Sequence, residues 1–177
     1  MIRLAATAAL ASTLLAVPAA FAQGQTDMND ATKVEMKGAD GASMGSISFV
    51  PTPHGVLIET DLENLPDGVH GFHIHETGTC EGDFSSAGGH YNPADSDHGY
   101  MSENGPHPGD MPNVTAAGGT VKVTVFNPNV TMTGGDAPLD DDDGSALVIH
   151  SGADDYASQP SGDAGSRIAC GVIFPAK

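Results

Sequence analysis

Two histidines separated by one residue, His73 and His75 in the segment GFHIHETGTC, are the first residues of this chain with obvious chemical potential. Alternate residues of a β-strand share a face, so the pair could bind a metal, line a pocket or lie in water. Two imidazoles alone do not decide among these three interpretations. A metal site would need further ligands from elsewhere in the chain.

Further histidines lie in a segment rich in turn residues, 79–118, which we call the long loop. His90, His98 and His107 are spaced eight and nine residues apart, and Asp110 follows three residues after His107. Three imidazoles and a carboxylate form a closed set of the kind that structural zinc prefers. Zinc would also supply folding energy to a segment whose composition alone favours disorder.

His150 ends the apolar run ALVIH, so it can join His73 and His75 at one end of a β-structure. Ligation by imidazoles alone suits copper. The other two histidines have no matching neighbours. We interpret His54, in the turn PTPHG, as solvated, and His70 as a packing or hydrogen-bonding residue beneath the site.

The elements that must position these ligands are β-strands. Apolar residues alternate along eight short runs, at 32–37, 45–49, 55–62, 68–76, 119–126, 129–133, 145–151 and 167–174. No amphipathic helix interrupts them, and glycine and proline separate them. The pattern predicts a single all-β domain over residues 23–177, an eight-stranded antiparallel barrel or sandwich. Residues 151–166, the second loop, lack the strand pattern as the long loop does.

The first 22 residues have the pattern of a secretory signal peptide. Arg3 precedes an apolar stretch at 4–17, and small residues flank Phe21 as in a cleavage site. We expect cleavage after Ala22 and a periplasmic or secreted mature protein. The stretch is shorter than the roughly 20 apolar residues of a membrane-spanning helix, which argues against an anchor.

The chain has two cysteines, Cys80 and Cys170, and disulfides persist where exported proteins reside. Free thiols acting as metal ligands are the alternative, but these two lack the close spacing of such sites. A single disulfide between them is therefore expected.

The composition excludes some partners. Without Arg3 the chain has five Lys and Arg against 23 Asp and Glu, a net charge near −18. Such a surface repels nucleic acid and anionic membranes, so neither is expected as a partner. The acidic run at 140–143 does not fit a calcium loop, since Leu139 and His150 stand where acids are needed. We interpret it as a solvated turn.

Five segments in order, GFHIHE, SAGGHYNP, HPGDMPNVTA, LVIHSGADD and GDAGSRIACGVI, resemble the copper/zinc superoxide dismutases. The resemblance extends over essentially all of residues 23–177. It implies a Greek-key β-barrel enzyme that disproportionates superoxide to oxygen and hydrogen peroxide by alternating reduction and oxidation of copper. The export signal points to the bacterial periplasmic branch, and a homodimer is left open.

The resemblance also implies a role for each site residue, with one copper and one zinc per chain. The implied copper ligands are His73, His75, His90 and His150, and the implied zinc ligands are His90, His98, His107 and Asp110. The shared His90 would bridge the two metals and take part in catalysis. Asp154 would link His73 to His98 from outside the ligand set, and Arg167 would draw superoxide to copper.

One departure from the family concerns charge. The second loop, where relatives often carry lysines, holds acids and no base. Attraction of superoxide would therefore depend on Arg167, with Lys33, Lys37 and Lys122 as other candidates on neighbouring strands. The alternative function is a copper/zinc-binding module, a metal buffer or donor. Such a module would need neither Arg167 nor the bridging His90.

Overall fold

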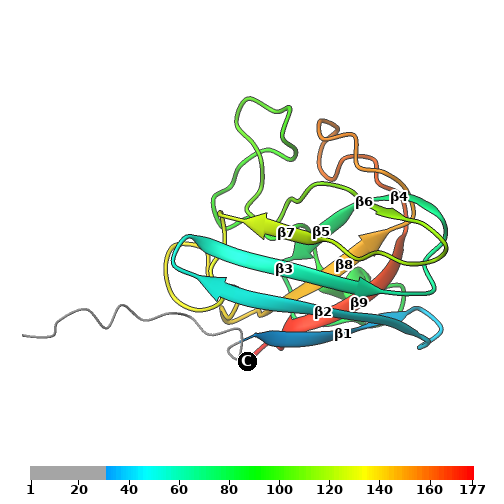
Figure 1. Cartoon of the computed structure of the whole chain (residues 1–177). Helices are drawn as coiled ribbons and strands as arrows, with labels where there is room; N and C mark the ends of the chain where they lie inside the picture. The colour runs from blue at the N-terminus through cyan, green and yellow to red at the C-terminus, as the bar shows by residue number, and fades with distance from the viewer. Residues whose placement is uncertain (1–30) are drawn as a thin grey trace, which may run out of the picture.

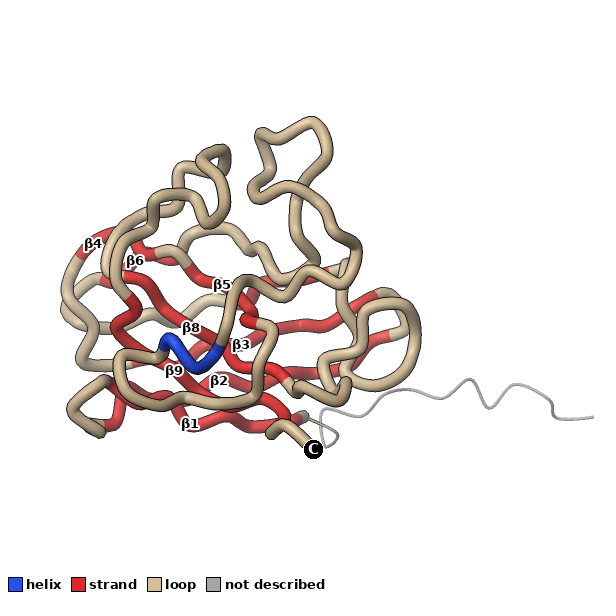
Figure 2. The backbone as a smooth tube through the Cα atoms, turned by 180° about the vertical axis from the view of Figure 1, so that it is seen from behind, coloured by secondary structure: helices blue, strands red, loops and turns tan. Residues whose placement is uncertain are grey.

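The structure is a computed structural model that describes residues 31–177, so the predicted signal peptide and its cleavage after Ala22 lie outside the described residues. This part of the chain is almost entirely β, and its one short helical turn is the 3-10 helix η2 (Ser85–Ala87), blue in Figure 2. Nothing in it forms a helix long and apolar enough to cross a membrane. The strands are β1 (Thr32–Gly38), β2 (Ser43–Thr52), β3 (Gly55–Leu62), β4 (Gly68–His70), β5 (Phe72–His75), β6 (Val114–Ala116), β7 (Thr124–Asn127), β8 (Ser145–His150) and β9 (Arg167–Phe174).

Seven of the strands form one antiparallel sheet in the order β5-β8-β9-β1-β2-β3-β7, while β4 and β6 pair separately. The sheet curls, and the two loops rise from one side of it (Figure 1). The prediction of an all-β antiparallel fold is confirmed. The described strands number nine rather than the predicted eight, because the alternating pattern misplaced elements at three points.

The predicted strand at 68–76 is divided at Gly71 into β4 and β5. The Gly71 N–H donates to Gly152 O, and Gly71 O accepts from His150 N, so this residue pairs with the second loop instead of continuing one ladder. The run at 129–133 forms no strand, and Thr131 makes only an isolated bridge to Pro138. Strand β6 was not predicted, since three residues are too few to show an alternating pattern.

The predicted strand at 119–126 begins only at Thr124. The Val123 N–H donates to the Thr60 hydroxyl at 2.9 Å instead of to a ladder carbonyl. Val123 is 41% exposed, whereas Val121 is buried beside Leu62, so the two valines do not share one buried face as the pattern predicted. A side-chain hydroxyl has replaced a backbone acceptor, which no periodicity can reveal.

The core fills the inside of the curled sheet. The main apolar cluster takes alternate residues of β1, β2 and β3, such as Met36, Phe49 and Ile58, all fully buried. Strand β8 is buried on both faces: Leu147 and Ile149 join this main cluster, while its other face joins a second one. That second cluster contains Phe84, Ala87, Ala146, Val148 and Cys170. The long loop therefore packs as a hydrophobic cover on the outer face of β8 and β9.

The predicted disulfide is present. Cys80 and Cys170 are bonded, with Cα atoms 5.8 Å apart and a sequence separation of 90. Cys170 lies opposite Val148 in the β8–β9 ladder, so the bond fastens the start of the long loop to the centre of the sheet.

We expect Cys80→Ser to lower the free energy of unfolding by about 2–5 kcal/mol, because the unfolded chain regains the freedom of a long closed loop. Denaturant unfolding of the variant and the parent, both metal-free, measures this difference. Two free thiols in the native parent protein, counted by quantitative labelling, would contradict the disulfide itself.

Candidate metal centre

The four side chains of strand β5 alternate between the two faces of the sheet. All four are buried, but Phe72 and Ile74 enter the main core while His73 and His75 lie on the opposite face. In the ladder with β8, His73 is opposite Val148 and His75 is opposite Ala146. These residues of β8 share a face with His150, two positions further on. The predicted strand geometry thus places three imidazoles on the outer face of the sheet.

The long loop covers the free edge of β5. Tyr91 N donates to Ile74 O at 2.8 Å, and Ile74 N donates to Gly109 O at 2.9 Å. The same pairing forms isolated bridges between His75 and His90 and between His73 and Asp110. The loop residues therefore reach the strand histidines through backbone register. The edge is also closed to pairing with another chain.

His73, His75, His90 and His150 form the first cluster, all buried, with ligand atoms within 4.8 Å of one another. In the described structure, four buried nitrogens here have no hydrogen-bond partner: His73 Nδ1, His75 Nε2, His90 Nε2 and His150 Nε2. Buried polar atoms without partners are rare and costly. A transition metal that takes imidazole ligands, such as copper, fits these four nitrogens.

Asp110 is the centre of the second cluster. Its Oδ1 lies 2.8 Å from His90 Nδ1, 3.1 Å from His98 Nδ1 and 3.2 Å from His107 Nδ1. Its Oδ2 accepts from the Gly99 and His107 N–H groups. These bonds hold the pKa of the buried Asp110 carboxyl far below its usual range, although burial opposes them. The donor set matches that of structural zinc.

His90 belongs to both clusters, through Nε2 in the first and Nδ1 in the second. Burial lowers its pKa to about 4, against the raising effect of the hydrogen bond with Asp110. Burial, and then the neighbouring His73, lowers the pKa of His150 to about 3. Both rings are therefore neutral near pH 7, which is the state that binds a metal.

Asp154 connects one histidine of the first cluster to one histidine of the second. Its Oδ2 lies 2.7 Å from His73 Nε2, and its Oδ1 lies 3.0 Å from His98 Nε2. Burial raises the pKa of Asp154, but bonds from His73, Tyr156 N and His98 bring it to about 2. Burial lowers the pKa of His98, yet its bonds to Asp110 and Asp154 outweigh this and raise it. Carboxylates in this position fix ring orientation and tautomer.

Arg167 lines a cavity of about 550 Å³ together with His75, His90 and His150. Its Nη1 donates to Phe84 O at 2.5 Å and its Nη2 to Gly88 O at 2.6 Å. Both acceptors lie in the part of the long loop that the disulfide fastens. The guanidinium is thus fixed at the wall of the cavity that exposes the first cluster.

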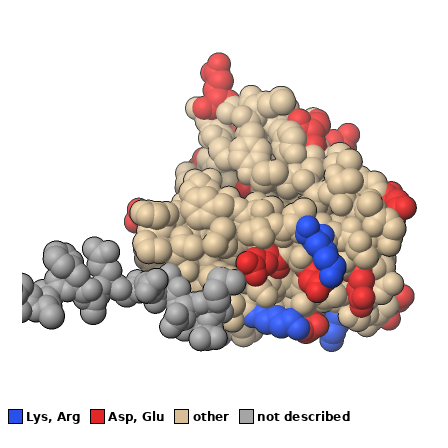
Figure 3. Space-filling model, viewed as in Figure 1, with Lys and Arg blue, Asp and Glu red and all other residues tan. Residues whose placement is uncertain are grey.

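The lysines proposed as additional bases do not reach this cavity. Lys33 of β1 pairs with Glu35, and Lys122, in the segment before β7, pairs with Asp61; both pairs are exposed to solvent. Figure 3 shows the few basic side chains on this side lying close to acidic ones. The expectation that they approach the site is wrong, because each points from its strand toward solvent or another cavity.

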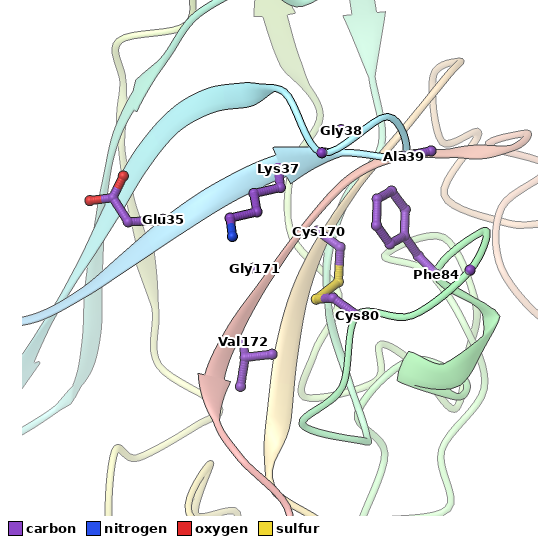
Figure 4. Close-up of a pocket in the computed structure, with 11 residues that line it drawn as sticks. Glu35, Lys37, Gly38, Ala39, Cys80, Phe84, Cys170, Gly171 and Val172 are labelled. Atoms are coloured by element: carbon purple, nitrogen blue, oxygen red, sulfur yellow. A yellow bond between two sulfur atoms is a disulfide. The ribbon is translucent and has the colours of Figure 1, made fainter.

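That other cavity, about 510 Å³, lies beside the disulfide and is lined by Lys37, Glu35, Phe84 and both cysteines. Figure 4 shows the disulfide and Phe84 between β9 and the long loop. It contains no histidine, so it is separate from the clusters. Of the two remaining histidines, His54 is exposed and His70 is buried, as predicted.

The two residues whose side-chain amides hold the backbones of Asp154 and His98 were not predicted from the sequence. Asn113 bonds the backbone of Asp154, and Gln159 bonds the backbone of His98. No signal in the sequence singles them out, since amide side chains are common in loops and act here only through the folded arrangement of two separate segments.

The chain belongs to the copper/zinc superoxide dismutase family, whose model matches residues 43–173. It is 45% identical to superoxide dismutase [Cu-Zn] 2 of Aquifex aeolicus, over 93% of this chain and 95% of that one. A solved SOD-like protein from Bacillus subtilis has a TM-score of 0.77 and 37% identity, covering 80% of this chain and 97% of that one. The Cu/Zn superoxide dismutase from Brucella abortus has a TM-score of 0.66 and 33% identity, covering 81% and 99%.

We expect Asp154→Asn to weaken metal binding by about 10- to 100-fold, the usual cost of losing a carboxylate that orients ligands. The amide keeps the shape but cannot accept from both His73 and His98. Competition with a chelator of known affinity, for zinc and for copper separately, measures the change. Affinities equal to those of the parent would show that Asp154 orients neither ring.

Proposed function

We propose that this protein is an exported superoxide dismutase that binds one copper and one zinc per chain. It converts two superoxide anions and two protons to oxygen and hydrogen peroxide. The observation that supports this most strongly is the set of four buried, unpartnered nitrogens, one of them on the ring that also belongs to the zinc-like cluster. The disulfide and the bacterial relatives support an exported protein, which we place in the periplasm or outside the cell. The proposed cleavage after Ala22 rests on the pattern of the first 22 residues.

In this proposal each metal has its own set of ligands, and His90 belongs to both sets. His73, His75, His90 and His150 hold copper, and His90, His98, His107 and Asp110 hold zinc. Bound there, copper would supply the one-electron redox chemistry that disproportionation of superoxide needs. The His90 Nε2 atom, when free, can carry the proton that peroxide requires, which is general acid catalysis. Asp154 keeps His73 and His98 in orientation.

Arg167 positions the anion. Two of its N–H groups bind fixed carbonyls, and the guanidinium retains further donors and its full charge at the cavity wall. Its charge is felt at His75 and His150, where it lowers each pKa after burial and neighbouring imidazoles. A small anion entering the cavity is therefore attracted to the side that exposes the first cluster.

A metal-binding module without catalysis is the alternative. The name of one relative, superoxide dismutase-like protein of Bacillus subtilis, is a reason to judge this chain by its own residues. A buffer has no use for a fixed arginine or for a shared ring, and both are present here. Steady-state superoxide consumption by the metal-loaded protein separates the two functions, since only the enzyme turns over.

We expect His90→Ala to abolish the magnetic coupling between copper and a cobalt(II) ion placed in the zinc cluster, where zinc itself is diamagnetic, and to remove most of the activity. The reason is that no other ring in the described structure contributes to both clusters. Electron paramagnetic resonance of the copper/cobalt(II) proteins measures the coupling, and metal analysis with an activity assay of the copper/zinc proteins measures the rest. Parent protein that retains a single zinc after copper loading would contradict the two-site assignment.

The charge of the chain leads to a second prediction. Glu76 and Asp95 line the same cavity as Arg167, and the whole chain is acidic. Screening acts over about 8 Å at physiological salt, so nearby charges outweigh distant ones. We expect the rate to fall as salt is added, and to fall at least tenfold in Arg167→Glu, about 1.4 kcal/mol.

The measurement is the bimolecular rate constant as a function of ionic strength, for the parent and for Arg167→Glu. A parent rate that rises with ionic strength would mean that global repulsion governs encounter, and the local role of Arg167 would be rejected.

A further inference from the structure

The two loops are joined by two side-chain amides, one on each loop, and each amide bonds the backbone of the other loop. Asn113, at the end of the long loop, accepts from Asp154 N at 2.9 Å and donates to Asp154 O at 2.8 Å. Gln159, in the second loop, accepts from His98 N at 2.9 Å and donates to His98 O at 2.9 Å. Each amide thus satisfies both backbone groups of one residue in the opposite loop, as a neighbouring strand would.

The two residues held in this way are the two ends of one buried link. His98 Nε2 lies 3.0 Å from Asp154 Oδ1, and both side chains are almost fully buried. Because each residue is fixed at its backbone by the other loop, neither backbone can move away from the link without breaking two hydrogen bonds. The orientation of His98 between Asp110 and Asp154 depends on this arrangement.

The loops leave no space beside the link. Gly99, with φ +92°, approaches Tyr156 so closely that a Cβ would lie 2.1 Å from Tyr156 O. On the other side a Cβ on Gly162, with φ +69°, would lie 1.8 Å from Asp154 Oδ1. The Met101 N–H also donates to Tyr156 O at 3.0 Å. The contact between the loops is therefore specific and extends to both sides of His98.

Gln159 is exposed to solvent, unlike His98 and Asp154. Its Nε2 also lies 3.2 Å from Ser102 Oγ and 3.1 Å from Ala157 O, and it packs in neither apolar cluster. Its contribution is therefore hydrogen bonding at the outer end of the link. A change of its amide alone leaves the apolar clusters and both sets of metal-ligand atoms intact.

We propose that Gln159 is a positioning residue for the zinc cluster. By binding both backbone groups of His98, it keeps that imidazole in place and slows the loss of zinc. The proposal rests on the proposed function in that it takes zinc as the occupant of the cluster around Asp110.

The test compares Gln159→Glu with the parent. The carboxylate keeps the size and the acceptor for His98 N, but it sets a charged oxygen against His98 O where a donor was. His98 O keeps its hydrogen bond from the Ser102 hydroxyl, so the expected cost comes from the lost amide bond and the repulsion between the two oxygens. The matched control is Asn64→Asp, which adds the same charge at an exposed amide bonded to Ser43 O on β2. Zinc-loaded proteins are mixed with an excess of chromogenic chelator, and zinc release is timed.

We expect zinc release to be about tenfold faster in Gln159→Glu and unchanged in Asn64→Asp. The visible spectrum of cobalt(II) bound in place of zinc should also change in Gln159→Glu only, because it reports ligand geometry. The unfolding midpoints of the metal-free variants should match each other.

Release at the parent rate with an unchanged cobalt spectrum would overturn the proposal. So would faster release with an unchanged cobalt spectrum and a lowered midpoint for metal-free Gln159→Glu, since that pattern describes general destabilisation. Failure of the proposed function looks different: parent protein that retains zinc but consumes no superoxide contradicts the enzyme and not the role of Gln159.

Discussion

The burial of two carboxylates, Asp110 and Asp154, is the constraint on which the site depends. A buried carboxylate costs several kcal/mol unless donors surround it, and no lysine or arginine is paired with either one in the described structure. The donors are imidazoles and backbone N–H groups from β5, the long loop and the second loop. Satisfying both carboxylates therefore requires these three segments to meet at one place.

The sheet brings these segments together at two places, the edge of β5 and the outer face of β8 and β9. The edge of β5 accepts the backbone of the long loop, which brings His90 and Asp110 beside His75 and His73. The outer face of β8 and β9 accepts Phe84 and the disulfide, which fix the carbonyls that hold Arg167. Loops with few strand residues thus become ordered by three different interactions: backbone pairing, apolar packing and a covalent bond. Order in the loops does not rest on a metal alone.

The parts of this structure that could be predicted are those governed by local pattern. Alternation placed β3 and β9 at their observed bounds, and the two-residue period placed His73 and His75 on one face. The pattern failed at Val123, where the Thr60 hydroxyl replaces a backbone acceptor, because that bond joins residues far apart in sequence. For the same reason Gln159 was not predicted. Its function depends on which backbone lies across from it, and only the folded loops decide that.

Charge acts over two distances in this molecule. The net charge of the chain acts at long range and favours cations, whereas Arg167 acts within the cavity and favours an anion. A chain with 23 acids and six bases attracts metal cations from a distance and repels an anion such as superoxide. Long-range attraction would therefore assist metal loading, whereas the proposed reaction has to proceed against it. Within the cavity the balance is set over a few ångströms by Arg167, Glu76 and Asp95, and by the charge of the bound metals. In the proposed reaction an acidic surface and an anionic substrate are compatible because the half-buried arginine is held at the cavity wall, where salt screens its charge less than on an open surface.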